Sequence, residues 1–175
     1  MSDTFITIIA IFLAAILMFV FPLMTLADRN DDITHLTVQT ATSEFVDEIR
    51  RTGKLTFDDY NSFVSTIGAT GNAYDVELQF KILDENPAKK TSQSDDITVI
   101  GENVYYSVYT TQIEDKLGSG SQEYLLKEGD IVSVSVKNRG ATLAQTLRNV
   151  YYRVTGNETY TIFASSAGTV TVNGK

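Results

Sequence analysis

The chain has 175 residues, with 22 acidic residues against 14 Lys and Arg, so its formal net charge is -8. An acidic surface repels phosphate groups, and nucleic acid is therefore not an expected ligand. The sequence has no cysteine, which excludes disulfides, thiolate metal sites and a cysteine nucleophile.

The most informative segment is an apolar run near the N-terminus, because no charged residue occurs between Phe5 and Ala27. As a helix this run would be about 35 Å long, enough to cross a hydrocarbon core of about 30 Å. We therefore predict a transmembrane helix at residues 5–27, behind a short tail at residues 1–4. The alternative is a signal peptide cleaved after Thr25-Leu26-Ala27. Against cleavage, the run lacks a basic n-region and is longer than a usual h-region.

Orientation follows from weaker signals. Arg29 follows the span and no Lys or Arg precedes it, which by the positive-inside rule favours a cytoplasmic C-terminus. Long domains, however, translocate largely regardless of such charges. The Thr- and Ser-rich, cysteine-free sequence after the span is more typical of an exported domain. We expect a single-pass protein of the cell membrane with an extracellular C-terminal domain.

Apolar residues continue beyond the span at roughly helical spacing, which predicts an amphipathic helical stem at residues 28–52. Its predicted apolar stripe comprises Ile33, Leu36, Ala41, Phe45, Val46 and Ile49. Thr52-Gly53 is a stop signal, because glycine readily adopts the left-handed cap conformation. A second helix is predicted to begin after Thr56 as N-cap, with an apolar stripe of Phe57, Tyr60, Val64 and Ile67.

Residues 53–175 are predicted to form an α+β head with a small antiparallel sheet that carries helices on one face. The clearest strand signal is strict alternation of apolar and polar residues from Tyr74 to Ile82. Residues 84–96 look like a turn and a polar loop. Residues 97–117 are ambiguous, and we favour a helix over 102–117 that ends at Gly118-Ser119-Gly120.

The C-terminal third is predicted to contain further strands and one helix. A turn at Glu128-Gly129-Asp130 precedes a strand whose valines share one face, and Thr142 can cap a helix over residues 143–154. Two short strands are predicted at residues 160–164 and 169–172, around a turn at 166–168. The many tyrosines of this half are expected at the edge of the core, with a protein-binding surface as the alternative.

Residues with catalytic or ligand-binding chemistry are scarce. The single histidine, His35, lies on the predicted stem; a zinc site there would need three or more carboxylates, and a catalytic triad would need His35 to leave the stem. No phosphate-binding glycine motif occurs, and the acidic clusters lack the spacing of a calcium loop. We therefore expect no enzyme, no cofactor and no metal site.

An apolar N-terminal helix with a late proline, Pro22, that continues into an amphipathic stem and an α+β head resembles the type IV pilins, pseudopilins and Tad-type minor pilins. The segment A-T-S-E-F-V-D-E-I-R-R-T-G-K-L-T-F-D-D-Y, which continues to Glu77, is similar to a module of uncharacterised membrane-anchored proteins of Gram-positive bacteria. The chain begins M-S-D-T-F, without the glycine and the glutamate by which pilins resemble one another.

This resemblance implies a structural or assembly subunit, or an accessory component, of a bacterial pilus-like or secretion apparatus. Its partners would be the membrane and other membrane or pilus-like subunits, with copies of itself as one option. The alternative is a monomeric, membrane-tethered extracellular binding or sensor module. The residues predicted to pack against partner helices are Ile9, Leu13, Ile16, Val20, Pro22, Leu36, Phe45 and Ile49.

Overall fold

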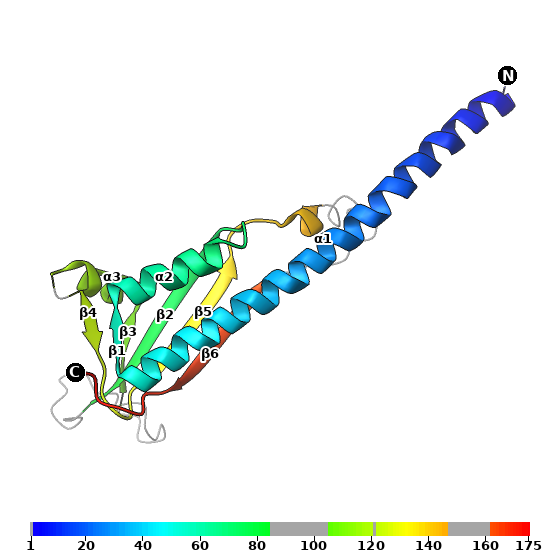
Figure 1. Ribbon diagram of the computed structural model, residues 1–175. Helices are drawn as coiled ribbons and strands as arrows, with labels where there is room; N and C mark the ends of the chain where they lie inside the picture. The colour runs from blue at the N-terminus through cyan, green and yellow to red at the C-terminus, as the bar shows by residue number, and fades with distance from the viewer. Residues whose placement is uncertain (1, 85–104, 121, 147–161) are drawn as a thin grey trace, which may run out of the picture.

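The computed structural model describes residues 2–84, 105–120, 122–146 and 162–175. One long helix, α1 (Ser2–Thr52), runs from the N-terminus into a small α+β head, as Figure 1 shows. The predicted loop at residues 88–96 and the predicted helix beyond residue 146 lie outside the described residues. The expected fold class, a long N-terminal helix with an antiparallel sheet, is confirmed at this level.

The head is built around a four-stranded antiparallel sheet in the order β3-β2-β5-β6. Its strands are β2 (Tyr74–Leu83), β3 (Tyr105–Tyr109), β5 (Ile131–Asn138) and β6 (Phe163–Thr169). Two short strands, β1 (Lys54–Thr56) and β4 (Glu123–Leu125), form a separate antiparallel pair. Helices α2 (Phe57–Gly68) and α3 (Thr110–Gly118) complete the described elements.

Period-two alternation in β2 and β5 places one face of the sheet in the core. Phe80 pairs with Val132 and Leu78 with Val134, and all four side chains are buried. The C-terminal half of α1, together with α2 and α3, covers this face (Figure 1). Burying such apolar side chains contributes about 1.5–3 kcal/mol for each, so this contact attaches the helix firmly to the sheet.

The turn from α1 into α2 follows the predicted signals. Thr56 caps α2: its hydroxyl accepts the N–H of Asp59, while the carboxylate of Asp59 accepts the N–H and the hydroxyl of Thr56. The predicted apolar stripe of α2 is wrong in part, because Phe57 and Val64 are exposed and Phe63 is buried instead. Phe63 stacks on Phe45 of α1 with ring centroids 4.2 Å apart, and this contact sets which face of α2 turns inward.

The predicted helix over 102–117 is wrong in its first half. Residues 105–109 form β3, which pairs with β2, and α3 begins only at Thr110. The run Y-Y-S-V-Y is rich in residues that favour strands, and the sheet supplies a partner that a local pattern does not reveal. The side chain of Gln112 then accepts the N–H of Tyr109 and caps α3.

The C-terminal strands also differ from the prediction. Residues 166–168 do not form a turn, since β6 runs through them and pairs with β5 from Lys137↔Phe163 to Ile131↔Thr169. Hydrogen bonding to β5 outweighs the local turn signal. Thr142 does cap a helical turn at residues 143–146, because its hydroxyl accepts the N–H of Gln145.

The C-terminal segment clasps the end of α1. Gly53 takes a left-handed conformation (φ 69°), and a Cβ built there would lie 2.2 Å from the carbonyl oxygen of Val172 and 2.5 Å from the nitrogen of Gly174. The N–H of Thr171 donates to the carbonyl of Arg50, and the carbonyl of Gly53 accepts the N–H of Leu126. Backbone atoms from three segments therefore meet where the helix ends.

We expect Gly53→Ala to destabilise the head more than Gly71→Ala. Both glycines have positive φ, so both substitutions introduce strain of about 1–3 kcal/mol, but a Cβ at Gly71 meets no atom within 4 Å. The backbone clash at Gly53 should add about 2 kcal/mol or more. Urea unfolding of the full chain in detergent, followed by tyrosine near-UV circular dichroism, measures the difference. Equal losses of unfolding free energy would show that the C-terminal segment shifts easily to make room for a Cβ at position 53.

A hydrogen bond joins the two shorter helices. The hydroxyl of Tyr60 on α2 donates to Glu114 of α3 at 2.7 Å. Partial burial of the phenol, followed by this hydrogen bond and the negative charge of Glu114, raises the pKa of Tyr60 well above its ordinary value. The folded head therefore holds the phenol proton more tightly than the unfolded chain does.

This difference predicts a loss of stability at alkaline pH. The contribution is complete below the unfolded pKa of about 10 and declines as the pH rises above it. Tyr60→Phe should cost about 1 kcal/mol at neutral pH and should make the unfolding free energy less steep between pH 10 and 11.5. Tyr109→Phe, at an exposed tyrosine, should keep the wild-type slope. Identical slopes for all three proteins would contradict the assignment.

Candidate functional site

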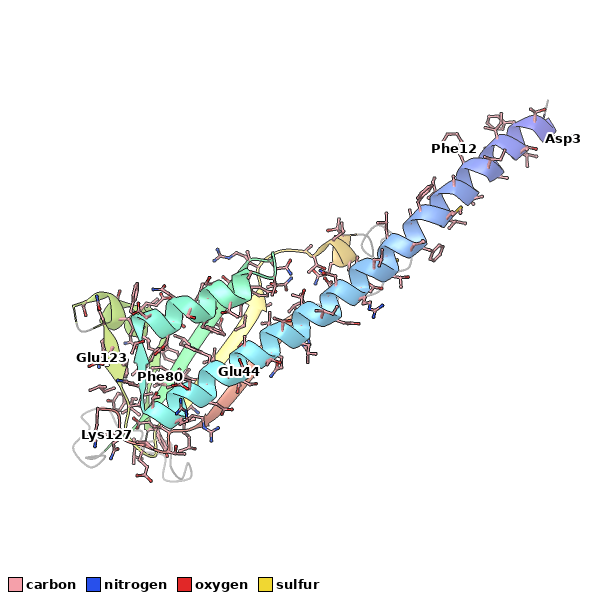
Figure 2. The ribbon with its side chains drawn as sticks, viewed as in Figure 1. Asp3, Phe12, Glu44, Phe80, Glu123 and Lys127 are labelled. Atoms are coloured by element: carbon pink, nitrogen blue, oxygen red, sulfur yellow. The ribbon has the colours of Figure 1, made fainter. Side chains whose placement is uncertain are left out.

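The N-terminal half of α1 exposes its apolar side chains on all sides. Met18 is 76% exposed and Phe12 is 68% exposed, and no residue from Asp3 to Leu26 is buried. Figure 2 shows side chains projecting around the helix with no other element beside it. A soluble protein rarely leaves so large an apolar surface uncovered, so this surface marks an interaction with lipid or with another protein.

Two threonine hydroxyl groups of this segment are satisfied within the helix. The hydroxyl of Thr7 donates to the carbonyl of Asp3, and that of Thr25 donates to the carbonyl of Phe21. Away from Pro22, the backbone groups of the helix interior are paired along the helix, which is the condition for entering hydrocarbon. The hydroxyl groups of Thr7 and Thr25 can therefore leave water without losing their hydrogen-bond acceptors.

Length and hydropathy agree with this interpretation. Within the described part of the chain, α1 is the single helix long and apolar enough to cross a membrane. The finding is compatible with a single-pass membrane protein, and a signal sequence would pass the same test.

Pro22 lies inside α1, and the helix continues past it in Figure 1. Proline has no N–H to donate to the carbonyl four residues earlier, that of Met18, so one backbone acceptor at this depth loses its ordinary helical donor. Such positions are tolerated in membrane helices.

The stem half of α1 is only partly as predicted. Phe45, Val46 and Ile49 are buried against the sheet and α2, as the stripe requires. Ile33 and Leu36 instead face outward, with exposures of 59% and 67%. Between residues 31 and 42, the inward face of the stem carries Val38 and the polar residues Asp31, Thr34 and Thr42.

Hydrogen bonds explain how polar residues occupy a buried face. The hydroxyl of Thr142 donates to the carboxylate of Asp31, and the hydroxyl of Thr42 donates to the carbonyl of Val38. A paired polar group loses little on burial. A search for apolar periodicity misses such positions, and no signal in the sequence distinguishes them from exposed ones.

The stem also closes the outer edge of the sheet. The side chains of His35, Gln39 and Arg50 donate to the backbone carbonyls of Phe163, Ser165 and Thr169 on the edge strand β6. The guanidinium group of Arg50 lies so close to Gly168 that a Cβ there would be 2.4 Å from its Nε atom. His35 is thus a hydrogen-bond donor to the sheet edge.

The predicted helix-packing residues fall into two groups. The first group is exposed and includes the residues of the span and one stem residue: Ile9, Leu13, Ile16, Val20, Pro22 and Leu36. The second group, Phe45 and Ile49, packs inside the chain's own head. Among the described residues, no group of three or more His, Cys, Asp or Glu side chains is placed to hold a metal ion.

Comparisons with known proteins identify no relative. No protein-family model, curated protein or solved structure matches the chain.

We expect Leu13→Arg to weaken membrane attachment. A charged side chain in the middle of a span costs about 2.5–3.5 kcal/mol on insertion scales, whereas Thr25→Arg, near the end of the span, can reach the interface and should cost much less. The measurement is the fraction of full-length protein that stays in carbonate-washed membranes. Recovery of the wild-type chain in the lipid-free soluble fraction would contradict membrane anchoring.

Proposed function

We propose that this chain is a structural or assembly subunit, or an accessory component, of a bacterial pilus-like or secretion apparatus. In this proposal the N-terminal half of α1 anchors it in the membrane, and the acidic head lies outside the cell. The observation that carries the proposal is that one 51-residue helix contributes both the exposed apolar rod and a large part of the head's core.

One continuous helix joins the apolar segment to the head, with no linker between them. The C-terminal half of α1 packs on the head through the buried side chains of Val38, Phe45, Val46 and Ile49, and its end is hydrogen-bonded to the C-terminal segment. A tethered module that works alone gains nothing from such a connection, since a flexible linker would serve it. A subunit that must hold its head at a fixed angle to its neighbours needs a connection without a linker.

The outward face of the stem suits contact with a neighbouring helix. Ile33 and Leu36 are exposed on α1 just beyond the span, on the helix face that also carries Leu26. Apolar residues at this spacing are typical of a helix–helix seam. This face would extend packing from the span into the stem.

The test combines imaging with a matched pair of variants. In mild detergent we expect the wild-type chain to form filaments or large oligomers visible by electron microscopy. The double variant Ile33→Gln, Leu36→Gln should disperse them. Asn30→Gln should not, because Asn30 is an exposed polar residue turned about 60° from Ile33 and about 120° from Leu36 around the same helix. Both variants should unfold within about 0.5 kcal/mol of the wild type, because the substituted residues are exposed.

The opposing outcome is also clear. A wild-type chain that stays a monodisperse monomer at all concentrations would favour the tethered binding or sensor module. Oligomers that survive the double variant unchanged would remove the stem face from the assembly surface.

A further inference from the structure

The two edges of the four-stranded sheet differ. On β6 the outward-facing carbonyls of Phe163, Ser165 and Thr169 accept hydrogen bonds from α1 side chains. On β3, at the other edge, no strand among the described residues pairs with the outer side. Among the described residues, therefore, α1 closes one edge of the sheet and no strand covers the other.

Hydrogen bonding establishes which groups of β3 face outward. The N–H of Leu78 donates to the side chain of Thr110, which follows β3 directly, so the N–H and C=O of Leu78 point toward β3. Because backbone groups alternate in direction along a strand, those of Phe80 and Ile82 point toward β3 as well. Val108 and Tyr106, opposite Phe80 and Ile82, therefore bond to β2. The alternate residues of β3 direct their N–H and C=O groups away from the sheet.

Part of this outward row is used by α3. The N–H of Tyr109 donates to the side chain of Gln112. Within the described part of the chain, no backbone hydrogen-bond partner is seen for the N–H and C=O of Tyr105 and Ser107 or for the C=O of Tyr109. Ser107 lies at the centre of this row, with one tyrosine two residues away on each side.

The strand carries none of the usual features that discourage edge pairing. Natural edges are blunted by charged residues, proline or bulges, but the sequence of β3 is Y-Y-S-V-Y. Tyr106 and Tyr109 are 49% and 57% exposed. Tyr106 also lines a cavity of about 340 Å³, where Leu83 and Leu125 lie beside charged residues such as Lys127 and Asp130.

We propose that β3 pairs antiparallel with β3 of a second copy of this chain, about a two-fold axis at Ser107. The sequence is self-complementary in this register. Tyr105 of each copy faces Tyr109 of the other on the open face of the sheet, and Tyr106 faces Val108 on the other face. Aromatic and aromatic–aliphatic cross-strand pairs are favourable, and with no charge on the strand two chains of net charge -8 meet without local repulsion.

This inference deepens the proposed function and rests on it in one respect, that copies of the chain lie side by side. A five-residue edge is a small interface, well below the roughly 1,000 Å² of a stable complex. Pairing should therefore be weak in dilute solution and become substantial where the anchor concentrates the heads in one membrane.

The test uses single cysteines, because the chain has none of its own. Opposed residues at an antiparallel hydrogen-bonded pair have Cα atoms about 5.5 Å apart, within disulfide range. We expect full-length Ser107→Cys, reconstituted in lipid vesicles and oxidised, to form disulfide-linked dimers about tenfold faster than Ser165→Cys. Ser165 is a matched control, an exposed serine on the same face of the closed edge strand β6.

A second pair of variants tests the backbone itself. Ser107→Pro removes the outward N–H, a change that an edge strand tolerates, whereas Ser107→Ala keeps it. Both lose the bond that the side chain of Ser107 accepts from Gln79. We expect Ser107→Pro to weaken head-to-head association in vesicles, measured by energy transfer between labelled copies, about thirtyfold relative to Ser107→Ala, for two hydrogen bonds lost at the axis.

Equal dimer formation at positions 107 and 165, or equal association of the proline and alanine variants, would overturn the pairing. The outcomes also separate the two proposals. Dimers trapped at position 107 without any larger assembly would support the pairing and count against the assembly function. Assemblies that depend on Ile33 and Leu36 but yield no dimer at position 107 would do the reverse.

Discussion

The structure depends on α1 remaining one helix from the apolar segment to the centre of the head. Among the described residues no other element packs against its N-terminal half, and its C-terminal half supplies Val38, Phe45, Val46 and Ile49 to the core. Removing the C-terminal half of α1 would uncover one face of the sheet. The core of the head therefore includes part of the same helix that carries the exposed apolar surface.

The same helix determines how the sheet meets its surroundings. By donating His35, Gln39 and Arg50 to the carbonyls of β6, it closes one edge that would otherwise be available for pairing. Gly168 and Gly53 are both required by this arrangement, since a side chain at either would collide with Arg50 or with the C-terminal segment. The contacts that we propose with other molecules accordingly lie on the outward stem face and on β3.

A buried polar group on the inward face of the stem also positions a distant segment of the chain. Asp31 is buried and receives the hydroxyl of Thr142, far away in the sequence. A buried carboxylate is stable only with such partners, so this contact specifies where the segment after β5 meets the helix. Apolar residues in the same place would have packed with less directional preference.

Local patterns in the sequence determined much of this protein. Four features can be recognised from the sequence alone: the uncharged run from Phe5 to Ala27, the cap at Thr56, the alternation in β2 and the valines of β5. Each depends on spacing and side-chain type within a few residues. The tertiary structure alone decided which stem residues turn inward, that residues 105–109 become a strand, and that β6 runs through residues 166–168. These choices depend on partners distant in the sequence: β2 for β3, β5 for β6, and Thr142 for Asp31. Hydrogen bonds to such partners outweigh propensities worth a fraction of a kilocalorie per residue, and a local reading of the sequence contains no record of them.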